Sequence, residues 1–252
     1  MYETCPKCGY TQQPEDVSNS TTCPACGIIY AKWLKQQFRT ESGEQAETDH
    51  ADEEGFFARV LARLLATESR VEPVYFYCRL VVFGVFFLWG WHFILLDYSV
   101  DPYSIGKSFM HNINLVFHEA GHVLFRPFGW FMTILGGSLF QLMMPLIVLL
   151  TLIIKNNDTF GASIALWWFG QSFIDLAPYI DDALEQKLVL LGGRTGADAP
   201  GNHDWNNLLG ELNRLEKCHD YAATVDFLGC FLILLSFTWG GYLLYRQYEN
   251  LK

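Results

Sequence analysis

The stretch LVVFGVFFLWGWHFILLD, residues 80 to 97, is the first long apolar run of this 252-residue chain. Its only Asp, Glu, Lys or Arg residue is Asp97, at its end. A helix needs about 20 consecutive, mainly apolar residues to cross a bilayer. The run therefore indicates a membrane-spanning helix, and it starts too far along the chain to be a secretory signal peptide.

Four further apolar runs follow the first, and each is near the length of a membrane span. We predict spans over about 109–125, 131–154, 160–180 and 223–245. The fold class is therefore mainly α: a polytopic helical membrane protein of about five spans over residues 80–246, with a polar loop at 181–222. The composition agrees, because 17% of the residues are charged, against about 25% in a typical soluble protein.

Two cysteine pairs stand in the polar N-terminal region. Cys5 and Cys8 belong to CPKCG, Cys23 and Cys26 belong to CPACG, and 14 residues separate the pairs. Each pair places two thiolates on one tight turn, and two such turns make a tetrahedral zinc site. We predict a zinc ribbon over residues 1–38 with one structural zinc ion. Two disulfides are the less favoured alternative.

The cysteines and the charges also bear on location. Free thiolate ligands indicate a reducing compartment, and in a five-span arrangement most Lys and Arg residues fall on the side of the N-terminus. We expect an integral membrane protein, in the cell inner membrane if bacterial, with a cytoplasmic N-terminus and the C-terminal tail on the opposite side. A net charge of -10 without a Lys/Arg-rich run argues against nucleic acid. The expected partners are the lipid bilayer and a cytoplasmic protein at the ribbon.

Two segments connect the ribbon to the apolar runs. Residues 39–54 are acidic and polar, which is typical of a flexible linker. Within residues 55–72, Phe57, Leu61 and Leu64 share one helical face. This pattern predicts an amphipathic helix on the membrane surface, and packing of that helix on the protein itself is the alternative.

The second apolar run contains NLVFHEAGHVLF, residues 114 to 125, and so the pattern H-E-x-x-H. His118 and His122 are one turn apart on one helix face, so both imidazoles can bind one metal ion. Glu119 points about 100° away around the helix and can act as the general base on a water at that metal. A charged group in mid-bilayer costs about 2.5–3.5 kcal/mol. The motif therefore indicates a functional site with a catalytic zinc ion.

A third protein ligand is required, because catalytic zinc commonly has three. Asp175, Asp181 and Asp182 lie near the end of the fourth run and are candidates. His203 and Asp204 in the polar loop are another source, either as a ligand or as a histidine oriented by its neighbour. We favour a different role for Asp204, the N-cap of a short helix.

The motif in one membrane run, followed by an aspartate after a proline in a later run, resembles site-2 protease-like intramembrane metalloproteases. Their later motif reads roughly N-x-x-P-x-x-x-x-D-G. Asp175-Leu-Ala-Pro178 resembles its first part, and Asp182 falls one residue before the position of its aspartate. The resemblance covers about residues 109–183. It implies that Asp182 is the third zinc ligand and that the substrates are membrane-embedded proteins.

The expected function is that of a zinc-dependent intramembrane endopeptidase with one catalytic and one structural zinc ion. The ribbon would recruit substrates or regulate the enzyme. A membrane metallohydrolase with a non-protein substrate and a non-enzymatic zinc-binding adaptor are the alternatives. Glu119 argues against the adaptor, because a structural zinc site needs no general base. Nothing in the sequence separates the two hydrolases.

Overall fold

The protein is described from a computed structural model, in which residues 3–11, 13, 16, 21–34, 55 and 57–251 are placed. The chain divides into two compact units, Met1–Ala62 and Arg63–Lys252. The acidic linker predicted at 39–54 lies outside the described residues. The larger second unit carries the apolar runs.

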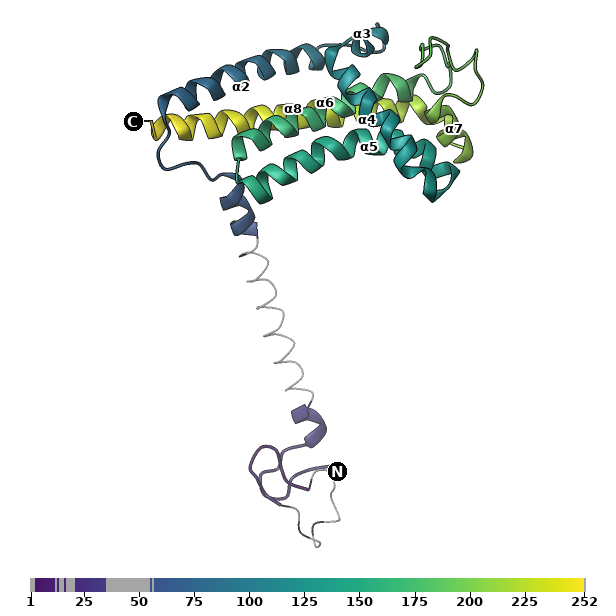
Figure 1. Ribbon diagram of the computed structural model, residues 1–252. Helices are drawn as coiled ribbons and strands as arrows, with labels where there is room; N and C mark the ends of the chain where they lie inside the picture. Colours follow the sequence, from purple (N-terminus) through teal and green to yellow (C-terminus); the bar gives the residue numbers. More distant parts are fainter. Residues whose placement is uncertain are drawn as a thin grey trace. The chain divides into compact units, whose positions relative to one another are not determined.

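Helices make up most of the second unit (Figure 1). In chain order they are α2 (Pro73–Ile94), α3 (Tyr103–Gly106), α4 (Phe109–Phe125), the 3-10 turn η2 (Arg126–Phe128), α5 (Trp130–Thr151), the π-helical turn η3 (Leu152–Asn156), α6 (Thr159–Asp181), α7 (Asp204–Glu211), the 3-10 turn η4 (Leu215–Lys217) and α8 (Cys218–Glu249). The described residues contain isolated β-bridges but no strand. The prediction of a mainly α fold is confirmed.

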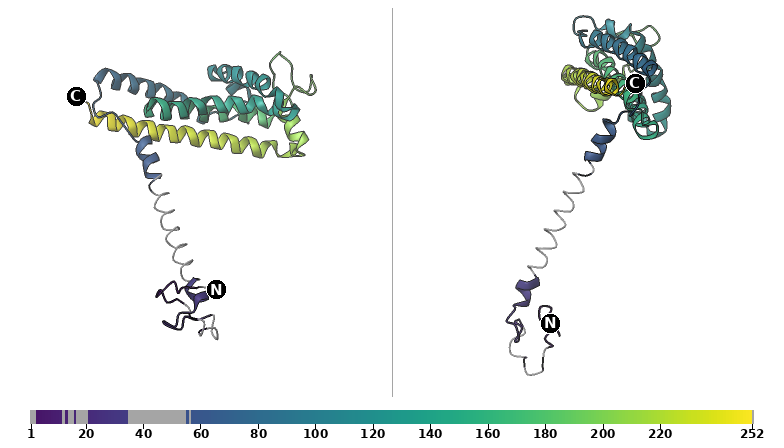
Figure 2. Two further views of the ribbon diagram at one scale, coloured as in Figure 1. Left: turned by 60° about the horizontal axis from the view of Figure 1, so that its bottom comes forward. Right: turned by 90° about the vertical axis from the view of Figure 1, so that its left-hand side faces the viewer.

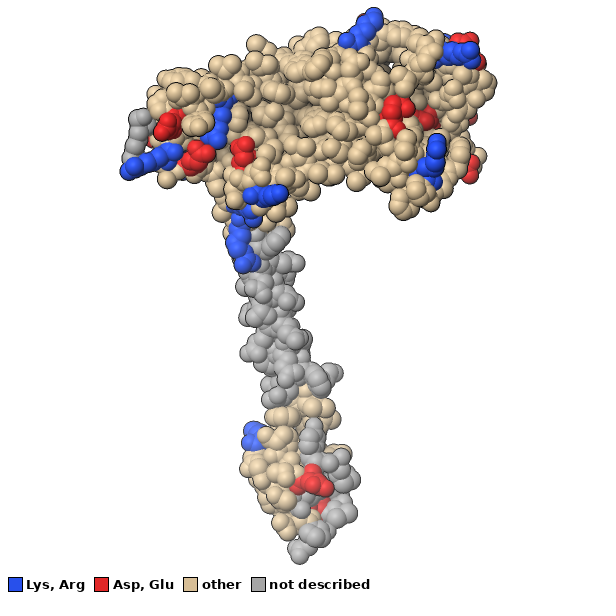
Figure 3. Space-filling model, viewed as in Figure 1, with Lys and Arg blue, Asp and Glu red and all other residues tan. Residues whose placement is uncertain are grey.

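In the part of the chain that the structure describes, three helical segments are long and apolar enough to cross a membrane. They are α2, the continuous segment Trp130–Asn156 formed by α5 and η3, and Leu215–Glu249 formed by η4 and α8. On the face drawn in Figure 3, charged side chains of this unit gather towards its two ends and leave a broad uncharged belt between them. Of the other two predicted spans, α4 has only 17 residues, and α6 buries polar side chains such as Gln171 and Asp175.

The long helices α2, α5, α6 and α8 run side by side (Figures 1 and 2), and three contacts fix their directions. Val71 and Leu251 form a β-bridge, so α2 begins where α8 ends. The Arg63 guanidinium donates to the carbonyls of Ile153 (3.2 Å) and Ile154 (2.8 Å), which places the end of the α5–η3 segment there as well. We call this the bridge end of the bundle. The start of α2 and the end of α8 therefore lie at one end of the bundle, whereas the five-span arrangement expects the C-terminal tail on the side opposite the start of its first span.

The chain that leads into α2 is less helical than predicted. The helix expected over 55–72 ends at residue 64, and the chain continues without helix to residue 72. Side chains of the bundle hold this segment: the Trp239 indole donates to the Leu64 carbonyl and the Thr159 hydroxyl to the Ala66 carbonyl, both at 2.9 Å. Carbonyls that accept these bonds are directed away from a continuing helix.

Helices α4 and α5 meet backbone to backbone. A Cβ added at Gly121 of α4 would collide with the Gly136 carbonyl of α5, and one added at Gly136 would lie 2.8 Å from the Gly121 carbonyl oxygen. Small residues allow two helices to approach so closely. This contact brings the histidine face of α4 against the first half of α5.

We expect Gly121→Ala to weaken this contact and destabilise the protein. The new methyl group would force the helices apart, and overpacking of this kind costs about 1–3 kcal/mol. Thermal unfolding in detergent measures the effect. Gly84→Ala is the control, because a Cβ there meets nothing within 4 Å. Equal unfolding midpoints for the two variants would show that the α4–α5 contact is not tight.

Candidate functional site

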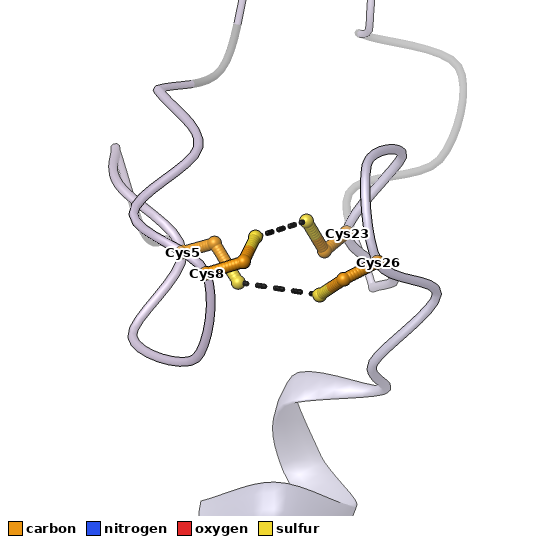
Figure 4. A group of neighbouring side chains, drawn as sticks. All are labelled: Cys5, Cys8, Cys23 and Cys26. Carbon is orange, nitrogen blue, oxygen red and sulfur yellow. Dashed lines mark hydrogen bonds between the residues drawn. The ribbon is translucent and has the colours of Figure 1, made fainter.

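The four cysteines of the N-terminal unit point their sulfur atoms at one another (Figure 4). The Sγ atoms of Cys5 and Cys26, and those of Cys8 and Cys23, are 3.8 Å apart, and all four lie within 4.8 Å of one another. Every cysteine is free, since a disulfide needs sulfurs about 2 Å apart. The predicted set of four is therefore assembled as a cluster that could hold a metal ion.

The two halves of the cluster repeat one backbone turn. Gly9 and Gly27 follow the second cysteine of each pair and adopt φ of 74° and 67°, a left-handed conformation that glycine accepts readily. Each glycine N–H donates to the carbonyl of the first cysteine, Cys5 or Cys23, at 2.9 Å. Two like turns place two cysteine pairs face to face.

The thiols of the cluster compete for negative charge. Burial raises the pKa of Cys23, but N–H groups of Cys26 and Ala25 outweigh burial and lower that pKa to about 6. An N–H at Tyr10 lowers the pKa of Cys8, whereas burial and the neighbouring thiols raise it to about 12. Four thiolates this close together therefore need a cation between them.

A second cluster lies in the helical unit, where α4 and α7 face each other. The side chains of His118, His122 and Asp204 bring one ligand atom each within 4.8 Å of the others. The Nε2 atoms of His118 and His122 lie 2.9 and 3.3 Å from one Asp204 carboxylate oxygen, Oδ2. The two histidines predicted as ligands are thus joined by an aspartate of the polar loop.

The second nitrogen of each imidazole is held by an oxygen that cannot donate. His122 Nδ1 lies 2.8 Å from the Thr133 carbonyl oxygen, and His118 Nδ1 lies 3.2 Å from Gln141 Oε1. Both Nδ1 atoms must therefore carry the proton and donate it. In a neutral ring the proton on Nδ1 leaves a lone pair on Nε2, and Nε2 faces Asp204 in both histidines. A histidine that binds metal through Nε2 needs this tautomer.

Three electron-rich atoms then converge on one point. Two Nε2 lone pairs and a carboxylate oxygen repel one another unless a metal ion, or a proton on each ring, lies between them. Two imidazoles and one carboxylate form a donor set of catalytic zinc sites. Gly137 of α5 keeps the space open, since a Cβ there would lie 2.7 Å from His118 Nε2 and 2.6 Å from His122 Nε2. The residues fit the zinc ion that the sequence predicts.

Asp204 is held as an anion. Burial raises its pKa, but the rings of His118 and His122 outweigh burial and lower that pKa to about 2 when they donate protons to the carboxylate from Nε2. Its backbone N–H donates to the hydroxyl oxygen of Tyr179 at 2.9 Å. The backbone of Asp204 is therefore held where its carboxylate faces both rings.

Glu119 shares a cavity with this cluster. The cavity has a volume of about 820 Å³, and its walls include the three clustered side chains, Glu119, Tyr179 and the apolar loop residues 188–191. Glu119 is half-buried. Its carboxylate has no hydrogen bond or ion pair with any residue that the structure describes, so it is available to water in the cavity.

The structure places two of the predicted ligand candidates away from the histidines. Asp182 accepts the N–H groups of Lys187 (2.8 Å) and Leu188 (2.9 Å) and so turns the chain after α6. Asp175 is separated from His118 by Gln141, whose amide nitrogen donates to the Asp175 carboxylate at 3.0 Å. The predicted role of Asp182 beside His118 and His122 is not what the geometry shows, because its carboxylate is occupied by the loop.

The remaining candidates also have other partners. Asp181 lies 2.7 Å from the His219 ring in a partly exposed pair. His203 is the N-cap of α7, and its Nδ1 accepts the N–H of Asn206 at 3.2 Å. Our favoured prediction that Asp204 is the cap is therefore wrong by one residue. Asp204 is the first helical residue, and its side chain is free to face the histidines.

Sequence reasoning gives Gln141 and Thr133 no role in the site, and it favours Asp204 as a helix cap over Asp204 as a ligand. Asp204 was weighed as a ligand source only together with His203, and its signal is a carboxylate next to a histidine in an otherwise polar loop. No motif marks Gln141 or Thr133. Their roles follow from the α4–α5 contact alone.

No family model, curated protein or solved structure matches the chain. The fold and the clusters define a mainly helical protein, whose described residues include three candidate membrane spans and two places that could hold a metal ion. The function must be argued from these places themselves.

The third ligand of the helical cluster is open to a direct test. We expect Asp204→Asn to lose the metal ion of this cluster and keep that of the cysteines, because the anionic ligand is removed. Asp182→Asn is the matched control and should retain both ions. Zinc content of the purified proteins, measured by elemental analysis, distinguishes the variants. Loss of zinc from Asp182→Asn alone would restore Asp182 as the ligand.

Proposed function

We propose that the protein is a zinc-dependent intramembrane endopeptidase similar to the site-2 proteases. The observation that carries the proposal is the meeting of two imidazole nitrogens and a carboxylate oxygen beside Glu119, whose own carboxylate has no partner among the described residues. A structural zinc site has no use for a free carboxylate beside it, whereas a hydrolytic site requires one.

The cluster supplies the groups that peptide hydrolysis needs. His118, His122 and Asp204 would hold zinc. A zinc ion there would polarise the substrate carbonyl and would lower the pKa of water, so that water could lose a proton and attack the carbonyl at neutral pH. Glu119 would take the proton of the attacking water and give it to the leaving amine. The oxygen of Tyr179 accepts the Asp204 N–H, and this side chain forms part of the cavity wall beside the cluster.

The surroundings favour a substrate from the membrane. The three apolar segments point to a bilayer, and the cavity beside the cluster is lined partly by the apolar residues 188–191. Such a cavity would accept an apolar peptide segment that has left its helix. We place the N-terminus in the cytoplasm, because its four free cysteines need a reducing compartment. The ribbon would recruit or gate substrates there.

Glu119→Gln tests the proposed reaction. We expect the wild type to cut at least one of a panel of single-span membrane proteins in liposomes, and the variant to be slower by about 10²–10⁴-fold, since it lacks the general base. Both proteins should bind zinc equally, because Glu119 is not a ligand. Mass spectrometry of the products identifies the cleaved bond.

Glu216→Gln, a change at an exposed glutamate, is the control and should cut like the wild type. A wild type that binds zinc at the helical cluster yet cuts no peptide would overturn the protease proposal. Hydrolysis of a lipid-linked molecule by the same preparation would then favour the non-protein substrate.

A further inference from the structure

Gln141 of α5 connects the proposed zinc site to a buried carboxylate. Its Oε1 lies 3.2 Å from His118 Nδ1, and its amide nitrogen donates to Asp175 Oδ2 at 3.0 Å. The same nitrogen lies 3.4 Å from the Ser172 carbonyl. All of these side chains are buried, and Gln141 and Asp175 also line the cavity beside the cluster.

The direction of this amide decides which histidine nitrogen can bind metal. With its oxygen towards His118, Gln141 accepts a proton from Nδ1 and leaves Nε2 unprotonated. With its NH₂ group towards His118, Gln141 would need a lone pair on Nδ1, and the neutral ring would then carry its proton on Nε2. That tautomer cannot bind a metal through Nε2, so a reversed Gln141 would remove one ligand.

Asp175 selects the first of these directions. A carboxylate only accepts hydrogen bonds, so it pairs with the NH₂ end of Gln141 and turns the oxygen end to His118. Two further donors hold the carboxylate: Asn114 Nδ2 at 3.2 Å and His111 Nδ1 at 3.0 Å. Three donors from α4 and α5 satisfy it without a proton of its own.

We infer that Asp175 is a positioning residue for the metal ion: through Gln141 it fixes the His118 tautomer, without touching the metal. The inference rests on the metal site of the proposed function. Partners of this kind behind a metal-binding histidine typically contribute about 10–100-fold to metal affinity. It also gives a role to the aspartate that stands where the site-2 protease-like motif has an asparagine.

Asp175→Asn tests the inference in the full-length protein. An asparagine can present either end to Gln141, so Gln141 is free to reverse. We expect zinc affinity at the helical cluster, measured by competition with a chromophoric chelator, to fall about 10–100-fold. The cysteine cluster is unchanged and serves as the internal reference in the same titration. Asp181→Asn, six residues further along α6, is the matched control and should bind zinc like the wild type.

A double variant separates positioning from a purely structural role. In Asp175→Asn combined with Gln141→Glu, the carboxylate and the amide exchange places. The carboxylate introduced on α5 then accepts the proton of His118 Nδ1 directly and accepts a second bond from the amide introduced on α6. We expect this double variant to regain most of the lost zinc affinity, and the Co²⁺ absorption bands of the nitrogen and oxygen site to return with it.

The outcomes distinguish the two proposals. Wild-type affinity in Asp175→Asn, or a double variant that stays as weak as the single one, overturns the positioning role and leaves the proposed function intact. A wild-type protein that binds zinc only at the cysteines overturns both.

Discussion

The close approach of α4 and α5 is the contact on which the helical site depends. Because Gly121 lies against the Gly136 carbonyl, the next residue of α5, Gly137, faces the two imidazoles rather than a gap. The same approach brings Thr133 and Gln141 to the two Nδ1 atoms, so one helix contact sets the position and the protonation of both histidines. A side chain at either glycine would separate the helices and release these bonds together.

The third member of the cluster is held by the residues that sequence reasoning took for ligands. Asp182 binds two N–H groups at the start of the polar loop, and His203 caps α7 at its end. Asp182 and His203 together fix the two ends of the segment 183–202. Asp204, which follows His203, is thereby placed beside α4. The buried ends of this loop must satisfy their backbone groups, which explains why the histidine and the aspartate are buried without facing the site.

The sequence predicts the local parts of this protein well and the distant contacts poorly. The apolar runs predict the helices, and the i, i+4 spacing of His118 and His122 predicts that their side chains share one helix face. The two similar C-x-x-C turns predict the cysteine cluster. Each of these features depends on residues that are close together in the chain. Asp204 is 82 residues beyond His122, and only the folded loop brings them together. The direction of the helices is a distant contact too: apolar length alone cannot show that Val71 and Leu251 meet at one end of the bundle.

The position of the site along the bundle bears on how water reaches it. His122 bonds to Thr133, near the start of α5, and Asp204 bonds to Tyr179, near the end of α6. Since α5 ends and α6 begins at the bridge end, the cluster lies towards the opposite end. A site there needs water to pass only part of the apolar layer. The polar loop over this end, with its α7 helix, then both supplies a ligand and forms one wall of the cavity. An apolar setting is therefore compatible with the proposed hydrolytic chemistry, because the cluster lies towards one end of the bundle and not at its middle.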